Sequence, residues 1–342
     1  MKAVVYRGAR TLDIEERPDV EPGRGELSIA VAYTGICGTD LHIYHGDMDG
    51  RVGAEAVIGH EMSGRVAKLG AGVTGWSVGQ PVTVMPTRSC GRCAACRRGL
   101  RHICHSMQFL GIDSPGAMQA LWNVPADLVL PLPEELPLEH AALIEPAAVA
   151  VHDVRRANVG IDDHVVVVGG GPVGVLIAVV ARHRGARVVL VEPDGFRRHV
   201  AAELGVEAVD PAAGDVVAMM NERTMDAGAD VAFEVSGSAA GVTTAVDVLT
   251  TRGRLVMVAI HPQPRPVNLH RFFWRELELL GARLYQREDM TEAIRLIATG
   301  EIAVQRLISR VGPVDTVGDA FTALESGGGV MKVLIDWQEQ PS

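Results

Sequence analysis

A glycine-rich segment near the middle of the chain limits the possible folds more than any other feature. Residues 169–174 read Gly-Gly-Gly-Pro-Val-Gly; four valines at 165–168 precede them and a helix-like apolar run follows. In a G-x-G-x-x-G pattern between a strand and a helix, Gly169 permits a tight turn and Gly171 lets a pyrophosphate approach the backbone. Gly174 then allows the helix to pack closely on the sheet. The segment, with Pro172 and Val173 opening the helix, predicts a dinucleotide site at a helix N-terminus.

The same alternation of strand and helix continues beyond this segment. Strand-like runs at 188–191, 230–234 and 254–258 alternate with helix-like runs at 197–204 and 239–249. Such alternation is typical of a doubly wound parallel sheet in the α/β class. Before about residue 145, by contrast, short apolar runs are interrupted by glycines, which is typical of a β-rich domain. A chain of 342 residues is long enough for two domains at ~150 residues each.

Composition excludes two classes of partner. The net charge is −10, and the basic residues are scattered, whereas a nucleic-acid-binding protein needs a clustered basic surface. The longest apolar run, Val173 to Ala181, is far shorter than the ~20 residues that span a bilayer. The N-terminal residues also lack the apolar core of a signal peptide. We therefore expect a cytoplasmic protein whose thiols stay reduced, with neither nucleic acid nor membrane as partner.

Four of the five cysteines, Cys90, Cys93, Cys96 and Cys104, have the spacing C-x2-C-x2-C-x7-C. Two-residue spacers let a turn direct consecutive thiolates at one tetrahedral zinc ion. A reducing compartment disfavours disulfides, and an iron–sulfur cluster would favour a shorter last spacer with a following proline, where this chain has His105. Four cysteine ligands leave no open position, so the spacing predicts a structural zinc site.

The fifth cysteine, Cys37, would by itself fit a buried small hydrophobe. Two other segments offer further metal ligands. One is the pair His60-Glu61. The other is Glu145, a carboxylate among apolar residues, near the point where the β-rich pattern gives way to alternating strands and helices. A buried charge at such a boundary usually has a partner. Cysteine, histidine and glutamate together make a zinc site with room for an exchangeable ligand, which is the arrangement of catalytic zinc.

The residue that ends the strand after the glycine-rich segment bears on the choice of dinucleotide. Glu192 lies 23 positions after Gly169, where a carboxylate can bind ribose hydroxyls and would repel a 2′-phosphate. This position favours NAD over NADP. Arg197 and Arg198 leave NADP open, because either could reach a phosphate, although both also fit a solvated helix surface.

Together these motifs resemble the zinc-containing medium-chain dehydrogenase/reductase family, and within it the sorbitol, butanediol and threonine dehydrogenase branch. The matching segments occur in the family's order and extend over essentially the whole chain: residues 37–42, 59–64, 90–104, 145–146 and 169–174. The resemblance implies a GroES-like catalytic domain at 1–147, a Rossmann dinucleotide-binding domain at 148–285, and a return of residues 286–342 to the catalytic domain. It also implies a homodimer or homotetramer.

The resemblance further implies a role for each candidate site residue. Cys37 and His60 would ligate the catalytic zinc, with Glu61 a ligand in some states of related enzymes. Glu145 would ligate the metal directly or through its water, and a glutamate at this position points to the polyol and diol branch. The chain would then carry two zinc ions, one catalytic and one structural.

The implied chemistry is oxidation of a secondary alcohol to a ketone. Thr39 would hydrogen-bond the zinc-bound alcohol oxygen, and His42 would continue a proton path to solvent, while hydride passes to the nicotinamide. A polyol, a vicinal diol or a similar small alcohol is the expected substrate, with L-threonine as the main alternative. A non-enzymatic zinc and dinucleotide sensor and a zinc-independent enone reductase are two further alternatives.

Overall fold

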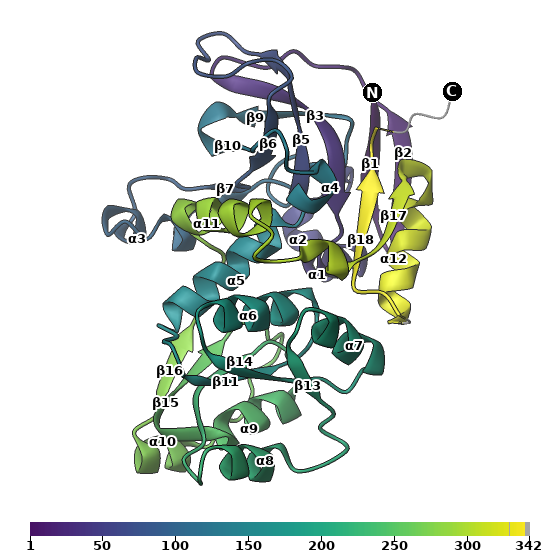
Figure 1. The fold of residues 1–342 in the computed structure, drawn as a ribbon. Helices are drawn as coiled ribbons and strands as arrows, with labels where there is room; N and C mark the ends of the chain where they lie inside the picture. Colours follow the sequence, from purple (N-terminus) through teal and green to yellow (C-terminus); the bar gives the residue numbers. More distant parts are fainter. Residues whose placement is uncertain (328, 339–342) are drawn as a thin grey trace. The chain divides into compact units, whose positions relative to one another are not determined.

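A computed structural model describes residues 1–327 and 329–338 (Figure 1). The chain divides into two compact units. The first contains residues 1–145, 286–300 and those from 307 onward, and the second contains residues 146–285 and 301–306.

The first unit is rich in β-structure. Its three-stranded sheet has the order β2-β1-β4, with bounds β1 (Lys2–Gly8), β2 (Thr11–Glu16) and β4 (Ala56–Val57). Its larger sheet has the order β10-β6-β5-β3-β18-β17, and β9 also pairs with β3. The strands of the larger sheet are β3 (Glu26–Gly35), β5 (Glu61–Leu69), β6 (Pro81–Val84), β9 (Leu121–Pro125), β10 (Val129–Pro131), β17 (Ile308–Pro313) and β18 (Lys332–Asp336). A two-stranded sheet, β7 (Thr87–Arg88) with β8 (Gln108–Phe109), flanks the cysteine-rich loop.

Short helices connect these strands, and two longer ones follow near the C-terminus. The helices are α1 (Gly38–Tyr44), α2 (Asp49–Val52), α3 (Ala94–Arg97), α4 (Leu138–Ala141), α11 (Arg287–Ala298) and α12 (Val317–Ser326). Helix α11 shows how the sequence specifies such an element. Gln286 and Asp289 form a capping box at its start, and Met290, Ala293, Ile294 and Ile297 recur at helical spacing on its buried face.

The second unit contains the predicted doubly wound sheet. Six parallel strands have the order β13-β12-β11-β14-β15-β16, so the order reverses between β11 and β14. The strands are β11 (His164–Val168), β12 (Arg187–Val191), β13 (Glu207–Val209), β14 (Ala229–Glu234), β15 (Leu249–Met257) and β16 (Glu278–Gly281). The helices are α5 (Ile144–Arg156), which begins at the junction with the first unit, α6 (Pro172–His183), α7 (Gly195–Glu203), α8 (Val216–Arg223), α9 (Ala239–Asp247) and α10 (Leu269–Arg275).

Both faces of this sheet are covered. Figure 1 shows α6 and α7 on one face and α8 and α9 on the other, which explains why β11 is a continuous run of buried valines. The predicted class, a Rossmann-type parallel sheet combined with a β-rich domain, is confirmed. Ligands of such sheets bind at the carboxyl ends of the strands beside the reversal of order, here the ends of β11 and β14.

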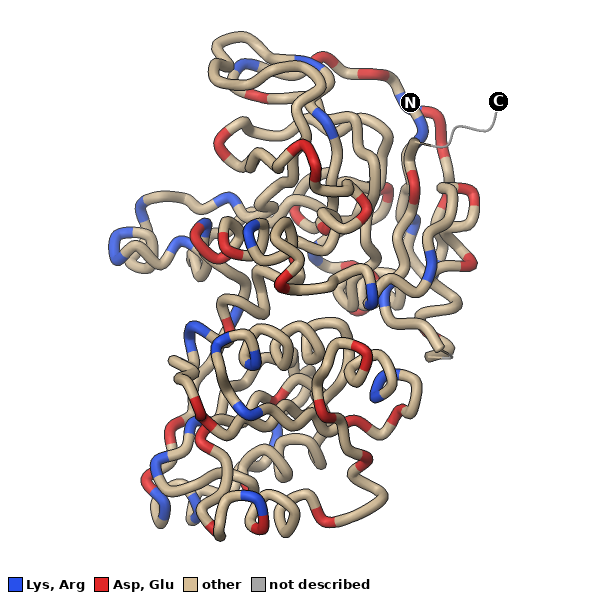
Figure 2. The backbone as a smooth tube through the Cα atoms, in the orientation of Figure 1, with Lys and Arg blue, Asp and Glu red and all other residues tan. Residues whose placement is uncertain are grey.

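Acidic and basic residues are interspersed along both units, and a small basic group lies around α3 (Figure 2). Within the described part of the chain, no helix is both long enough and apolar enough to cross a bilayer.

Candidate functional site

The strand pairing of the first unit brings Cys37, His60 and Glu61 together. Strand β3 ends at Gly35, opposite Glu61 of β5, so Cys37 and His60 flank a pair of neighbouring strands. The ligand atoms of the three residues all lie within 4.8 Å of one another. His60 and Glu61 are almost fully buried, and Cys37 is partly buried at the N-terminus of α1. A thiol, an imidazole and a carboxylate at this spacing fit a metal ion.

Asp40, to which sequence reasoning gave no role, adjoins this cluster. Its side chain is fully buried, and Oδ2 accepts a hydrogen bond from the Cys37 amide at 2.8 Å. Oδ1 lies 3.8 Å from His60 Nδ1, and among the described residues neither atom has a hydrogen-bond partner. An imidazole whose Nδ1 faces a carboxylate presents Nε2 to a metal, as in the carboxylate–histidine–zinc arrangement.

The electrostatics of the cluster favour a cation. Burial opposes the charged form of His60, but the Asp40 carboxylate, the Cys37 thiol and Glu145 raise the pKa of His60 well above its usual value. Burial raises the pKa of Asp40, and the neighbouring His60 opposes this rise. The excess of negative charge that draws a proton to His60 would equally stabilise a divalent ion. The residues present therefore fit the zinc that their types and spacing predicted.

Glu145 and Glu61 differ in their placement. Glu145 is 4 % exposed at the start of α5, and its charge acts on His60 and on Lys332. It is not one of the three residues whose ligand atoms all lie within 4.8 Å of one another. Glu61 belongs to that group, but both of its carboxylate oxygens accept hydrogen bonds from the buried Lys332. Sequence reasoning missed Lys332, although a lysine within the apolar run 330–335 is an unusual feature.

Helix α1 carries the other two candidate residues. Thr39 is partly buried two residues after Cys37, whereas the His42 side chain is 52 % exposed and its Nδ1 lies 3.0 Å from Asp47 Oδ2. Residues three apart share one side of a helix, so Thr39 and His42 are neighbours on α1. The helix thus connects the buried Cys37 cluster to solvent.

The four other cysteines form a second cluster, with all four sulfur atoms within 4.8 Å of one another. Each is a free thiol. Cys104 Sγ accepts from the amides of Cys90 and Ser106 at 3.3 and 3.4 Å, and such bonds stabilise thiolates. Hydrogen bonds from the amides of Cys96 and His105 lower the pKa of Cys93 to about 6, whereas burial raises that of Cys96 to about 11. Four convergent sulfurs supplied with amide donors fit a closed zinc site.

The glycine-rich segment adopts the conformation that its sequence requires. Gly169 has a φ of +109°, and a Cβ on Gly174 would lie 1.9 Å from the Gly169 carbonyl oxygen. Helix α6 starts at Pro172 with Gly171 as its N-cap, so no side chain caps its first amides. These amides are therefore available to an anion such as a pyrophosphate.

Glu192 lies beside this segment. Its carboxylate is buried and accepts hydrogen bonds from the amides of Gly170 at 2.6 Å and Asp194 at 2.8 Å. Arg197 Nη1 lies 4.0 Å from Glu192 Oε2. Arg198 instead donates to the carbonyl oxygens of residues 192 and 193 and pairs with Asp210. Of the two arginines, Arg197 therefore lies nearer to the Glu192 carboxylate.

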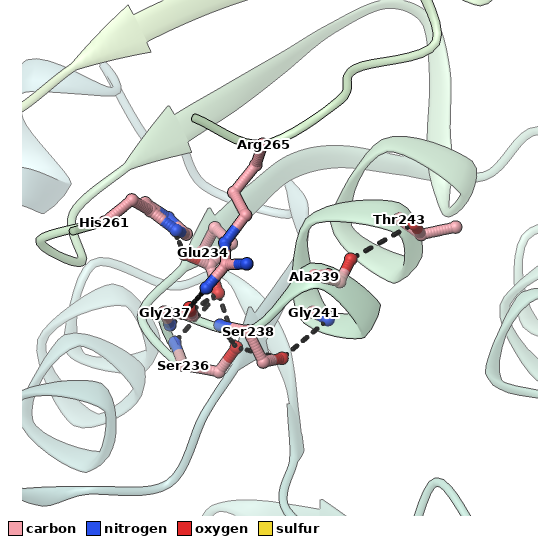
Figure 3. Close-up of polar contacts among 9 residues, drawn as sticks. All are labelled: Glu234, Ser236, Gly237, Ser238, Ala239, Gly241, Thr243, His261 and Arg265. Carbon is pink, nitrogen blue, oxygen red and sulfur yellow. Dashed lines mark hydrogen bonds and ion pairs between the residues drawn. The ribbon is translucent and has the colours of Figure 1, made fainter. Parts of the chain in front are cut away.

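A second carboxylate, that of Glu234, holds the loop that follows strand β14 (Figure 3). Glu234 is fully buried at the end of β14, and Oε1 accepts from the amides of Ser236 and Gly237, both at 3.0 Å. Oε2 lies 2.9 Å from His261 Nε2, in the loop after β15, and Arg265 of the same loop reaches the Gly237 carbonyl. These contacts fasten two loops together at the carboxyl edge of the sheet, where a dinucleotide would bind.

Comparison with protein-family models gives two matches. Residues 23–134 match the model described as "Alcohol dehydrogenase GroES-like domain", and residues 172–299 match "Zinc-binding dehydrogenase". The first match contains the cluster of Cys37, His60 and Glu61 and the cluster of four cysteines. The second match contains most of the parallel sheet.

Similar proteins extend over the whole chain. The chain is 46 % identical to a 2-dehydro-3-deoxy-L-galactonate 5-dehydrogenase of Pseudoalteromonas atlantica, over 98 % of both chains. It is 32 % identical to a sorbitol dehydrogenase of Halalkalibacterium halodurans and 34 % to an L-threonine 3-dehydrogenase of Mesorhizobium japonicum, over 98 % of this chain and 99 % of each relative. Among solved structures, a putative zinc-binding dehydrogenase of Sinorhizobium meliloti bound to NADP has a TM-score of 0.92 at 31 % identity, over 98 % of both chains.

Proposed function

We propose the substrate and the residue roles below from the premise that this chain belongs to the zinc-containing medium-chain dehydrogenase/reductase family. It is an alcohol or polyol dehydrogenase that uses zinc and a nicotinamide dinucleotide. Within that activity we propose that it acts on a secondary hydroxyl of a polyhydroxy acid of the sugar-acid type. The observation that carries this proposal is the 46 % identity over the full length to a sugar-acid dehydrogenase, against 34 % to a threonine and 32 % to a sorbitol dehydrogenase.

In the proposed site, Cys37 and His60 hold the catalytic zinc, and Asp40 orients His60. Zinc, when bound, lowers the pKa of a coordinated hydroxyl, and a bound nicotinamide ring accepts the hydride from its carbon. Thr39 accepts the hydrogen bond of the substrate hydroxyl and passes the proton to His42. His42, half exposed and paired with Asp47, releases that proton to solvent.

The remaining residues have structural and binding roles in this proposal. Cys90, Cys93, Cys96 and Cys104 hold a zinc ion that stabilises their loop and takes no part in the reaction. The amides at the start of α6 bind the pyrophosphate, and Glu192 binds the ribose hydroxyls. Because its buried carboxylate would repel a 2′-phosphate, we propose NAD as the preferred cofactor.

We further propose a cytoplasmic homo-oligomer, either a dimer or a tetramer. Four free thiols around one metal fit a reducing compartment. Among the residues that the structure describes, strand β16 pairs only with β15, so it is an edge of the sheet. Beside this edge, large apolar side chains are exposed: Leu269 75 %, Phe273 78 %, Trp274 74 % and Leu279 53 %. An open strand edge with exposed apolar neighbours fits association with a second copy of the chain.

The experiment that tests the substrate assignment is a panel of alcohols assayed by reduction of NAD and NADP. The panel contains aldonates and 3-deoxy-2-oxo sugar acids, sorbitol, 2,3-butanediol and L-threonine, with Cys37→Ser as the inactive control. We expect the highest kcat/KM with an acid. A higher kcat/KM for L-threonine or for a neutral polyol would overturn the assignment of substrate class but not that of reaction type.

A further inference from the structure

Glu234, at the end of β14, is a fully buried carboxylate whose two oxygens hold different segments. Oε1 accepts hydrogen bonds from the Ser236 and Gly237 amides, both at 3.0 Å, and from the Ser236 hydroxyl. Oε2 lies 2.9 Å from His261 Nε2, and since an ionised carboxylate can only accept, the hydrogen of this bond is on Nε2. Glu234 therefore joins the turn after β14 to the loop after β15 (Figure 3).

The loop after β15 depends on side chains for its attachment. Three of its residues 259–267, here called the proline loop, are prolines, which restrict the backbone. Its first amide donates to the main-chain carbonyl oxygen of Glu234 at 3.1 Å. Beyond that amide, no backbone hydrogen bond holds the proline loop within the described part of the chain. The side chains of His261 and Arg265 link it to the turn instead, Arg265 through a 3.5 Å contact with the Gly237 carbonyl oxygen.

The proline loop borders an open volume. A cavity of about 380 Å³ is lined by Val242 of α9, Met257 of β15, and His261, Pro264, Arg265 and Val267 of the loop itself. Closely packed protein leaves few voids larger than a water molecule, so a cavity of this size gives the loop room to move. Residues 262–264 are also exposed. The bond between His261 and Glu234 therefore holds a segment that close packing does not.

The position of this bond relates it to the cofactor. In the proposed site, Glu192 after β12 binds one ribose, and the start of α6 after β11 binds the pyrophosphate. The strand order β12-β11-β14-β15 then directs the nicotinamide half of the dinucleotide along the carboxyl ends of β14 and β15. The turn after β14 and the proline loop both lie at these ends.

We propose that His261 is a positioning residue whose hydrogen bond to Glu234 holds the proline loop where it can bind the nicotinamide half of the dinucleotide. This inference rests on the proposed cofactor site at Glu192 and α6. A loop that is already in place loses less conformational entropy when the cofactor binds, so the bond raises the affinity. In a purely structural role, loss of the bond would affect both halves of the cofactor alike.

The test compares the binding of NADH with that of ADP, which lacks the nicotinamide half, by calorimetry on the full-length, zinc-loaded protein. His261→Asn places its amide nitrogen near the position of Nδ1 and so loses the bond to Glu234. We expect its Kd for NADH to rise about tenfold, as for the loss of one hydrogen bond to a charged group, and its Kd for ADP to stay within about twofold. The KM for NAD should rise likewise, while kcat at saturating NAD should not fall.

His261→Gln is the matched variant, because it places its amide nitrogen near the position of Nε2. It should retain wild-type affinity for both ligands, since the Nδ1 atom that it lacks has no hydrogen-bond partner among the described residues. Gln263→Ala, at an exposed position of the same loop, should also bind NADH as the wild type does.

Three outcomes of this comparison would overturn the proposal. One is wild-type affinity for NADH in His261→Asn. Another is an equal loss of affinity for NADH and ADP in that variant. The third is an equal loss of NADH affinity in the Asn and Gln variants, which would mean that the imidazole ring matters and the hydrogen bond does not.

Glu234→Gln keeps the proposal testable if His261→Asn does not fold. Its side-chain oxygen can still accept from the Ser236 and Gly237 amides, but its amide group meets His261 without a negative charge. We expect the Kd for NADH to rise at least about threefold with an unchanged Kd for ADP, and a wild-type Kd for NADH would contradict the proposal. A wild-type protein that binds neither ligand would instead contradict the proposed cofactor site itself.

Discussion

At the scale of single residues, the orientation of His60 depends on a neighbour that would not touch the metal. Asp40 is fully buried, and its Oδ1 faces His60 Nδ1 at 3.8 Å. Burying a carboxylate has a free-energy cost, which the positive charge of a metal bound to His60 would offset.

Asp40→Asn should therefore weaken zinc binding at the Cys37 site by about 10- to 100-fold, since the amide lacks the charge that orients and polarises His60. Competition with a chelator measures this affinity, and zinc at the four-cysteine loop serves as an internal control because the substitution leaves that loop unaltered. Zinc affinity at the Cys37 site equal to that of the wild type would show that Asp40 has no such role.

We expect single side chains to decide the choice of dinucleotide as well. Glu192→Ala should raise the ratio of kcat/KM for NADP to that for NAD by about tenfold or more, because it removes a buried carboxylate from the proposed ribose site. Arg197→Ala is the matched variant: if Arg197 does not bind a phosphate, its ratio should stay near that of the wild type. A Glu192→Ala enzyme that still prefers NAD as strongly as the wild type would remove this carboxylate from the cofactor site.

What the sequence could predict at this scale depended on local spacing. The four cysteines and the glycine-rich segment lie within short stretches, so their geometry follows from turns and one helix start. Lys332 escaped detection because its partner, Glu61, lies 271 residues away along the chain. Asp40 lay within the matched segment, but only the three-dimensional structure shows that it is fully buried and faces His60.

At the scale of elements, we expect the four-cysteine loop to depend on a bound metal, because the loop contains little regular structure. Helix α3 has four residues, a 3-10 helix of three residues follows at Arg101–Ile103, and the two-stranded β7–β8 sheet flanks the loop. Convergence of four thiols must therefore supply much of the stability of the loop.

Cys93→Ser should accordingly lower the zinc content by about one ion per chain and the apparent Tm by on the order of 5–10 °C. Cys37→Ser is the matched control: it should also lose one zinc and all turnover, yet keep the Tm within about 2 °C. A Cys93→Ser protein as stable as the wild type would contradict a structural zinc site.

Zinc retention by this loop should also depend on pH. Thiols must lose their protons to bind the metal, and the pKa of Cys96 is raised to about 11 while that of Cys93 is lowered to about 6. Metal binding therefore releases protons, so affinity rises with pH and falls as the solution is acidified. A chelator titration of Cys37→Ser at pH 6 and pH 8 should show weaker retention at pH 6, and equal retention would contradict this reasoning.

The predicted elements of the parallel sheet were those with long apolar runs. The helix predicted directly after the glycine-rich segment is observed at Pro172–His183, and the strand predicted at 230–234 is observed at Ala229–Glu234. Strands β13 and β16 were not predicted, since three or four residues are too few to show a period. Trp274 is 74 % exposed, so it does not belong to the core of this chain.

At the scale of the whole molecule, the exposed apolar residues beside β16 bear on assembly. Trp274→Glu should shift the molecular mass measured by light scattering toward that of the 36.4 kDa monomer, because it places a charge in a buried apolar contact. Thr243→Glu, which adds the same charge at an exposed polar residue of α9, is the control. A wild-type protein that is already monomeric would contradict the proposed homo-oligomer.

The two units contain different parts of the proposed machinery. Both clusters of proposed metal ligands lie in the first unit, and the glycine-rich segment and Glu192 lie in the second. We therefore propose that the first unit holds two metal ions of different function: one held by four cysteines, and one with a free position for substrate.

Zinc content per chain, measured by elemental analysis before and after mild chelation, tests this account most directly. We predict two zinc ions per chain in protein purified without chelator. Mild chelation should remove one ion together with all dehydrogenase activity, and added zinc should restore both. A protein with one zinc ion that resists chelation, or activity that survives removal of the exchangeable ion, would contradict the catalytic zinc site at Cys37 and His60.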